Sequence, residues 1–288
     1  MAQLKAVACE LPSELGVPIS RFSRAELHRL VIERGVTEAS AATIARWLAE
    51  DALKPWQHRS WVFPRDPRFL ERAGPVLDLY PRRWKGRLLH PGEYVICADE
   101  KTQIQARQRA YPTAAPAPGR PQRIEHDYDR GGALGYLAAW DVHRGQLTGR
   151  CEQQTGIAPF GRLIEHVMTR DPYRKATRVF WIIDNSSSPR GQASIDRVQA
   201  EWPNLGLVHL PFHASWLNQI EIVFSVIQRK VLTPNDFPSL QAIVDRLDAF
   251  EHPYNRIATP FDRTFTRDDL EQLIARVAQH EPRLRLAA

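Results

Sequence analysis

The spacing of hydrophobic and polar positions follows two different patterns along this chain, and the pattern changes near residue 93. Before that point, apolar side chains recur every three or four positions, which is the period of an amphipathic helix. After it, short apolar runs such as 94–98 and 179–183 alternate with helical patterns. Runs of that length are typical of strands that are buried on both faces. The pattern predicts a helical N-terminal region followed by an α/β (α+β) domain, with a mixed sheet flanked by helices.

Residues 1–64 are predicted to contain two helices joined by a short turn. The first opens at a capping box, Ser23-Arg-Ala-Glu26, and the second begins at Ser40. The second helix has an apolar stripe on one side and leaves Thr43 and Arg46 on the other. This arrangement fits a helix-turn-helix unit that binds DNA, and it equally fits a small helical bundle without that function.

The rest of the chain is predicted to be a linker, 65–92, and one domain, 93–288. The linker includes a helical stretch at about 69–80. The predicted strands of the domain are 93–99, 135–141, 146–151, 178–184 and 206–210. The predicted helices are 159–168, 191–202, 216–231, 239–250 and 267–279. Residues 111–124 are rich in proline and are predicted to form a loop.

Composition narrows the class of protein. The 288 residues carry a formal net charge of +6, and the pI of about 9.4 favours a polyanionic partner. No apolar run approaches the roughly 20 residues that a membrane span needs, so no membrane association is expected. The three cysteines have no metal-ligand spacing and no signal peptide is evident, which favours a reduced, cytoplasmic protein.

Three acidic residues carry the candidate chemistry. Asp99 and Asp184 each end an apolar run, and Glu221 lies beside the apolar stripe of a predicted helix. Each alone has a common structural explanation, since an aspartate after a strand often caps a turn and a helical glutamate is usually exposed. Together they predict a site for divalent cations, and hard carboxylate oxygens are the ligands that Mg²⁺ prefers. Two such ions can clamp the attacking and leaving oxygens of a phosphoryl transfer.

At these residues the chain resembles the insertion-sequence transposases of the IS630 family, which are related to the Tc1/mariner elements. Five stretches carry the resemblance: Ala98-Asp-Glu-Lys-Thr-Gln-Ile104, His126-Asp-Tyr-Asp-Arg-Gly-Gly132, Trp181-Ile-Ile-Asp-Asn185, His213-Ala-Ser-Trp-Leu-Asn-Gln-Ile-Glu221 and Val231-Leu-Thr-Pro-Asn-Asp-Phe237.

The resemblance implies a ribonuclease-H-like domain whose catalytic, metal-binding residues are Asp99, Asp184 and Glu221. It implies two Mg²⁺ (or Mn²⁺) ions, DNA cleavage at terminal inverted repeats, and strand transfer into target DNA at TA steps, which unstack easily. A homodimer on double-stranded DNA, associated with the nucleoid, is expected. Five residues of the matching stretches are expected to support the site: Asn185, His213, Ser215, Trp216 and Asn218.

Phosphate contacts dominate affinity for DNA, so basic residues are expected to ring the three acids. The candidates are Lys101, Arg107, Arg109, Arg123 and Arg130, and Thr43 and Arg46 are the candidates in the N-terminal region.

Three features depart from the family pattern, and two of them, Pro189 and the short amino end, favour an alternative function. Pro189 stands where the family commonly has histidine, Phe261-Asp-Arg263 replaces a stretch that often holds tryptophan, and the amino end is shorter than that of related transposases. The alternative is a truncated or decayed transposase that acts only as a DNA-binding protein. A ribonuclease-H-like nuclease without transposition is disfavoured by the N-terminal helical unit.

Overall fold

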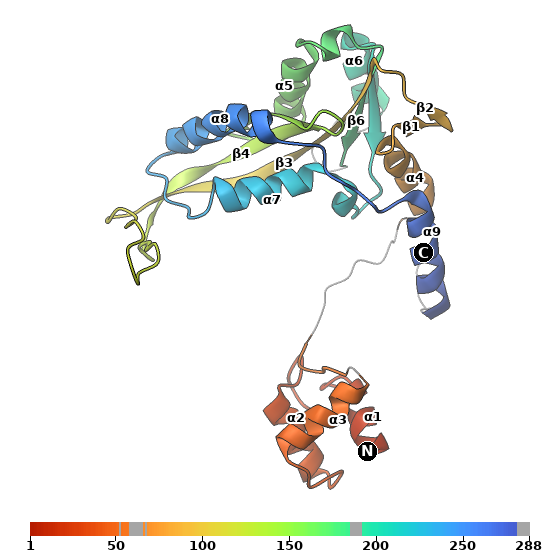
Figure 1. The fold of residues 1–288 in the computed structure, drawn as a ribbon, viewed down its shortest axis with the longest axis vertical. Coiled ribbons are helices and arrows are strands. Elements are labelled where there is room, and N and C mark those ends of the chain that lie inside the picture. Colours follow the sequence, from red (N-terminus) through yellow and green to blue (C-terminus); the bar gives the residue numbers. More distant parts are fainter. Residues whose placement is uncertain (52, 58–65, 67, 185–191, 281–288) are drawn as a thin grey trace. The chain divides into compact units, whose positions relative to one another are not determined.

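The computed structural model describes all residues except 52, 58–65, 67, 185–191 and 281–288. The chain divides into two compact units, Met1–Phe63 and Pro64–Ala288. Figure 1 shows helices alone in the first unit and a sheet with helices in the second.

Three short helices form the first unit: α1 (Ala2–Cys9), α2 (Arg24–Glu33) and α3 (Ala41–Glu50). The capping box that the sequence predicts is present, because the Ser23 hydroxyl accepts from the Glu26 amide and the Glu26 carboxylate accepts from the Ser23 amide. Ser40 caps α3 in the same way through the Thr43 amide. The core of this unit consists of Leu4, Ala8, Phe22, Leu27, Val31, Ile44 and Leu48.

A five-stranded mixed sheet forms the centre of the second unit. Its strands are β3 (Glu93–Gln108), β4 (Asp129–Asp141), β5 (Gln146–Glu152), β6 (Arg178–Ile183) and β7 (Leu205–His209), in the order β5-β4-β3-β6-β7. β3 pairs with β6 and β6 with β7 in parallel, whereas β3–β4 and β4–β5 are antiparallel. The predicted mixed α/β architecture is therefore confirmed.

The central strand β3 is longer than predicted. The sequence predicts that it ends at Asp99, but it continues for nine more residues, paired with β4. The extension reads as polar because one face is solvated while Ile104 and Ala106 are buried on the other, a pattern common in antiparallel pairs. Asp99 therefore lies within a strand and not at its end.

Helices cover both faces of the sheet. One face packs against α5 (Ile157–Met168) and α6 (Gln192–Glu201). The other packs against α4 (Phe69–Leu79), α7 (Ile220–Lys230), α8 (Leu240–Ile257) and α9 (Arg267–His280) (Figure 1). Side chains alternate between the two faces of a strand. Val95 and Cys97 accordingly join the core beneath α7, and Ile96 joins the core beneath α5.

Residues expected as a linker, 65–92, carry structure of their own. They contain α4 and a small hairpin made of β1 (Arg83–Trp84) and β2 (Arg87–Leu88). α4 buries most of its residues in the core beneath α7, because its apolar positions recur at helical spacing. The hairpin is fixed to the sheet by Glu93, whose carboxylate accepts two hydrogen bonds of 2.7 Å from the Arg87 guanidinium.

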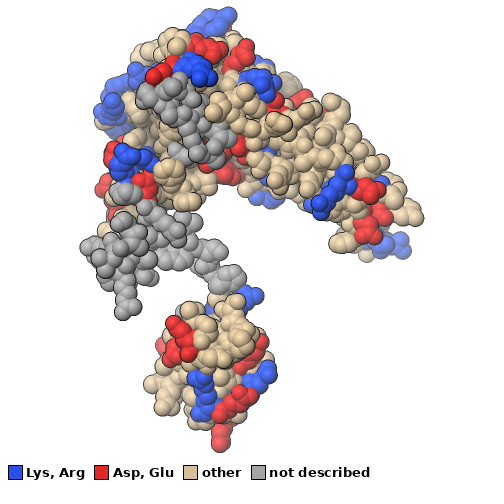
Figure 2. Space-filling model, turned by 180° about the vertical axis from the view of Figure 1, so that it is seen from behind, with Lys and Arg blue, Asp and Glu red and all other residues tan. Residues whose placement is uncertain are grey.

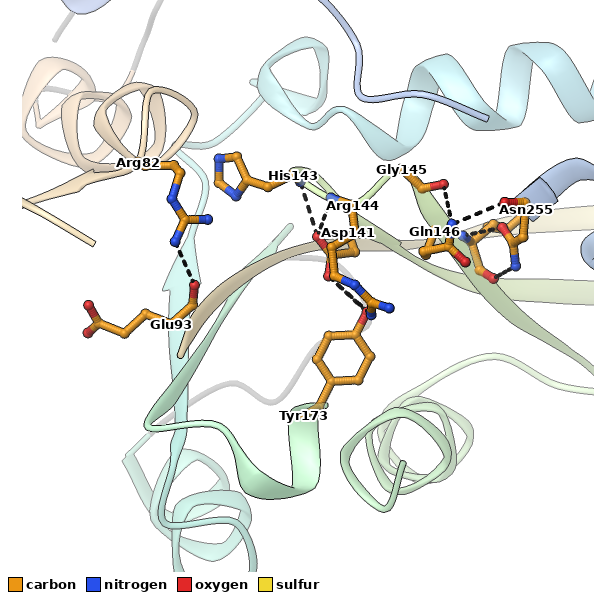
Figure 3. A network of polar contacts seen from close by, with 10 residues as sticks. Arg82, Glu93, Asp141, His143, Arg144, Gly145, Gln146, Tyr173 and Asn255 are labelled. Carbon is orange, nitrogen blue, oxygen red and sulfur yellow. Dashed lines mark hydrogen bonds and ion pairs between the residues drawn. The ribbon is translucent and has the colours of Figure 1, made fainter. Parts of the chain in front are cut away.

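A polar network fixes the turn between β4 and β5 (Figure 3). Asp141 is 1% exposed, and its carboxylate accepts from the amides of His143 and Arg144 and from the Tyr173 hydroxyl. Gly145 has φ of +64°, and a Cβ there would lie 2.9 Å from the Thr259 carbonyl carbon, so the turn requires glycine. In the part of the chain that the structure describes, no helix is long and apolar enough to cross a membrane.

Candidate active site

The register of the sheet brings Asp99 and Asp184 side by side. Ala98 of β3 pairs with Ile183 of β6 in the last rung of this parallel ladder. Asp99 is the next residue of β3, and Asp184 directly follows the end of β6. Side chains two residues apart on a strand point to the same face of the sheet. Asp99 therefore faces the same side as Cys97, and Asp184 the same side as Ile182. Cys97 and Ile182 both belong to the core beneath α7. The two carboxylates therefore face the same side of the sheet.

Glu221 approaches these aspartates from the first turn of α7. Asn218 fixes the start of α7 to β3, because its side-chain amide donates a 3.1 Å hydrogen bond to the carbonyl of Ala98, the residue before Asp99. Asn218 is 1% exposed, and its own carbonyl accepts from the Glu221 amide at 3.2 Å. A buried amide side chain thus connects the strand that carries one acid to the helix that carries another.

Electrostatics show that the three carboxylates share one environment. Asp99 is 9% exposed. Burial raises its pKa to about 7, the Glu100 amide opposes the shift by donating to Oδ1, and the negative charges of Asp184 and Glu221 raise the pKa further. Burial also raises the pKa of Glu221, whereas Lys101 lowers it and Asp184 raises it. Lys101 is two residues beyond Asp99 on the same strand and therefore lies on the same face of the sheet. Because its charge lowers the pKa of Glu221, its ammonium lies near that carboxylate.

The arrangement fits a divalent cation in its chemistry but is not a finished ligand set. Among the described residues, no group of three or more His, Cys, Asp or Glu side chains is arranged to hold a metal ion. The three carboxylates thus do not form a complete ligand set by themselves, and like charges at this edge repel one another. The donors are all carboxylate oxygens, and one of them is buried beside two further negative charges. A hard cation such as Mg²⁺ or Mn²⁺ neutralises such an environment.

The residues expected to support the site have different positions. Ser215 and Trp216 form a short 3₁₀ turn before α7, and both are exposed. The Trp216 ring contacts Phe265 edge to face, at 5.8 Å between ring centroids. His213 is exposed and has φ of +57°, a left-handed conformation that is uncommon for a residue with a side chain. Asn185 and Pro189 lie outside the described residues.

The basic residues expected to ring the acids have different positions. The charge of Lys101 acts on Glu221. Arg107 and Arg130 oppose each other farther along β3 and β4, and Arg123 is exposed in the loop between these strands. Figure 2, which views the molecule from behind, shows Lys and Arg interspersed with Asp and Glu over the described residues of that side.

Arg109 is a correction to the predicted phosphate-binding set. Its side chain is 6% exposed, and its guanidinium donates to the carbonyls of Glu125 and Asn235. It also stacks at 5.5 Å over the ring of Tyr128. Because its two terminal nitrogens donate inside the protein, Arg109 holds the chain just after the proline-rich loop against the segment after α7.

Two residues near the site were missed by sequence reasoning. Tyr80, at the end of α4, and Arg263, before α9, both donate hydrogen bonds to the carbonyl of Leu217. Leu217 precedes Glu221 by about one helical turn. No local pattern points to these contacts, because the partners are 137 and 46 residues apart in sequence.

Comparison with known protein families gives a match to the segment that contains Asp99, Asp184 and Glu221. A family model described as DDE superfamily endonuclease matches residues 94–244, which is more than half of the chain. The sequence shows no significant match to a curated protein.

Solved structures similar to this chain include the pre-cleavage Mos1 transpososome, with 17% identity, a TM-score of 0.52, and coverage of 90% of this chain and 79% of that chain. The Mos1 mariner paired end complex with Mn has 19% identity, a TM-score of 0.50, and coverage of 83% and 75%. This likeness confirms the predicted ribonuclease-H-like fold of the second unit.

Proposed function

This chain belongs to the DDE superfamily of endonucleases, and we propose that it is a transposase of the IS630 group within the Tc1/mariner relatives. It cuts double-stranded DNA at the terminal inverted repeats of its element. It then joins the freed 3′-hydroxyl to target DNA, at TA steps. The observation that carries this proposal is that Asp99 and Asp184 directly follow the last rung of the β3–β6 ladder and that Asp184 and Glu221 both raise the pKa of Asp99, within the segment that the family model matches.

Each acid has a role that follows from its position. Asp99 and Asp184 would hold divalent cations from neighbouring strands, and Glu221 would complete the ligand set from α7. Bound there, two Mg²⁺ or Mn²⁺ ions would supply Lewis-acid stabilisation of the charge that develops on the phosphate. Lys101 reduces the repulsion between Glu221 and the aspartates, and its exposed part would contact a DNA phosphate.

The first unit would recognise the repeat. α2 and α3 are joined by a short turn, and the exposed Arg46 lies on α3. We propose that α3 enters the major groove with Thr43 and Arg46 directed at the DNA, as in a helix-turn-helix. The protein would act as a homodimer on two repeat ends, in the cytoplasm at the nucleoid. The Mos1 structures, one of which is a paired end complex, support this assembly by likeness of fold alone.

A nicking assay tests the proposal. The substrate is a supercoiled plasmid that carries the DNA flanking the gene, including its inverted repeats, incubated with Mg²⁺ or Mn²⁺. We expect metal-dependent conversion to nicked and linear forms. Removing a residue that only supports a metal ligand typically costs about 10–100-fold, so loss of a ligand in Asp99→Asn, Asp184→Asn or Glu221→Gln should cost more than about 100-fold. Glu165→Gln, an exposed carboxylate of α5, is the matched control and should cleave like the parent.

Binding must be measured in parallel. Band shifts with the same repeat ends should be retained in the three acid variants, because phosphate contacts do not depend on these acids. Repeat-specific binding by the parent without any nicking would refute the enzymatic proposal for this copy and would favour the DNA-binding alternative. Equal nicking by the parent and Asp184→Asn would exclude Asp184 as a metal ligand.

A further inference from the structure

The carbonyl of Leu217 is held from two directions just before the catalytic helix. It accepts a 2.5 Å hydrogen bond from the Tyr80 hydroxyl and a 3.0 Å hydrogen bond from Nη1 of Arg263. The next residue, Asn218, is bonded to the Ala98 carbonyl of β3. Three donor–acceptor pairs therefore fix two consecutive residues to three separate elements, immediately before α7 carries Glu221 toward Asp99.

Tyr80 is itself fixed at both ends. Its backbone carbonyl lies 3.0 Å from Nε2 of His143, which must be the donor because a carbonyl only accepts. Figure 3 shows His143 in the network at the end of β4, beside the buried Asp141. The Tyr80 hydroxyl also lies 3.6 Å from the sulfur of Cys97, two residues before Asp99. The tyrosine thus connects the sheet to the turn that begins α7.

Arg263, from the C-terminal part of the chain, is the second donor to the Leu217 carbonyl. Its guanidinium stacks over the Tyr80 ring at 4.9 Å, and the neighbouring Phe265 contacts Trp216. Nε of Arg263 is buried without a hydrogen-bond partner among the described residues. A buried, unsatisfied donor lowers stability, so an arginine is not the side chain that maximal stability would select here. Its position is better explained by what its other nitrogen holds.

We propose that Tyr80 and Arg263 are positioning residues, which grip the Leu217 carbonyl and so set the distance of Glu221 from Asp99 and Asp184. The inference rests on the proposed function of the three acids. Both residues lie outside the matched segment 94–244, so two elements beyond the family's common region would control the geometry of its metal site. Neither residue contacts the reacting atoms; each acts through the backbone of the turn before α7.

Mn²⁺ binding to the full-length protein without DNA, measured by calorimetry, tests the proposal directly. Tyr80→Phe removes only the hydroxyl, and Arg263→Ala removes the second donor. Each should weaken Mn²⁺ binding by about 10-fold, as for other residues that orient metal ligands. The double variant should lose less than the sum of the single losses, because both donors act on one carbonyl. Arg263→Lys, which keeps one donor, should restore part of the affinity.

Two matched controls separate positioning from general stability. Tyr136→Phe removes a buried tyrosine hydroxyl that has no hydrogen-bond partner among the described residues and lies beside Gly149 of β5. Arg178→Ala removes a cation that stacks at 5.6 Å over Phe180. Both should leave Mn²⁺ affinity unchanged. Parental affinity in both Tyr80→Phe and Arg263→Ala would overturn the positioning role while leaving the proposed function intact.

Hydrogen exchange gives a readout that does not depend on metal or activity. In Tyr80→Phe, the amides of residues 219–222 should exchange about 10-fold faster than in the parent, and in Tyr136→Phe they should not. If the parent neither binds Mn²⁺ nor nicks DNA, the proposed function fails. Hydrogen exchange alone then tests whether the Tyr80 hydroxyl holds the start of α7. Unchanged exchange there would refute it, and faster exchange confined to Tyr80→Phe would uphold it.

Discussion

Replacing Glu93 by glutamine should destabilise the second unit in a strongly pH-dependent way. Glu93 is the first residue of β3 and is 2% exposed. Its carboxylate accepts two hydrogen bonds from Arg87, each 2.7 Å, and one of 2.8 Å from the His90 amide. The hydrogen bonds from Arg87 are the largest cause of a pKa lowered from 4.5 to about 2, and burial works against them.

The magnitude follows from the difference between the two pKa values. A shift from 4.5 to about 2 corresponds to at most about 3 kcal/mol in the free energy of unfolding. The Arg87 side chain is 51% exposed, so solvent screening reduces this to about 2 kcal/mol. Because the folded-state pKa lies below the unfolded-state value, the stabilisation is complete above about pH 4.5. It is lost as the pH falls from there toward about 2.

Urea unfolding followed by tryptophan fluorescence measures this contribution, since Trp140 and Trp181 are fully buried in the second unit. The free energy of unfolding of the parent should exceed that of Glu93→Gln by about 2 kcal/mol at pH 6–7 and by less than about half of that at pH 3. Glu165→Gln should match the parent throughout. A difference that stays constant between pH 7 and pH 3, or is absent at pH 7, would refute the role of the ionised Arg87–Glu93 pair.

Three further outcomes are expected. Asn218→Ala should lower the free energy of unfolding by about 1–3 kcal/mol in urea titrations, because it leaves the Ala98 carbonyl without this donor, and it should weaken Mn²⁺ binding in calorimetry. Arg109→Ala should speed tryptic cleavage within the loop 111–124, since the guanidinium ties that region to the residues after α7; an unchanged cleavage rate would contradict this. Leu27→Ala should cost the first unit about 2–5 kcal/mol and abolish repeat-specific band shifts, while circular dichroism retains the signal of the second unit.

There is a physical reason why the sequence predicts that Asp99 and Asp184 lie close together. Both follow apolar runs of the kind that buried parallel strands require, and alternation along those runs determines which face each aspartate meets. The prediction that Glu221 approaches the same face depends on helical periodicity, which is equally local. These are properties of short segments, so they can be seen without knowledge of the fold.

The misplaced predictions involve information that is not local. The second half of β3 reads as polar because one of its faces is solvated, and only its partner β4 shows that it is a strand. Arg109 reads as a surface cation, and only the return of the chain near Asn235 shows that its donors are used internally. The contacts of Tyr80 and Arg263 with Leu217 likewise join parts of the chain that no pattern relates.

The dependence of the site on distant segments limits what the matched region can do alone. A fragment of residues 94–244 would contain all three acids, yet it would lack both donors to the Leu217 carbonyl. It would also lack α4 and α9, which cover the core beneath α7 on the face that the acids share. Without α4 and α9 part of this core would be exposed, and of the three hydrogen bonds that hold the turn before α7 only the one from Asn218 to the Ala98 carbonyl would remain. On the proposed function, the acids would supply the chemistry, and the segments on either side of the matched region would fix the turn that precedes Glu221.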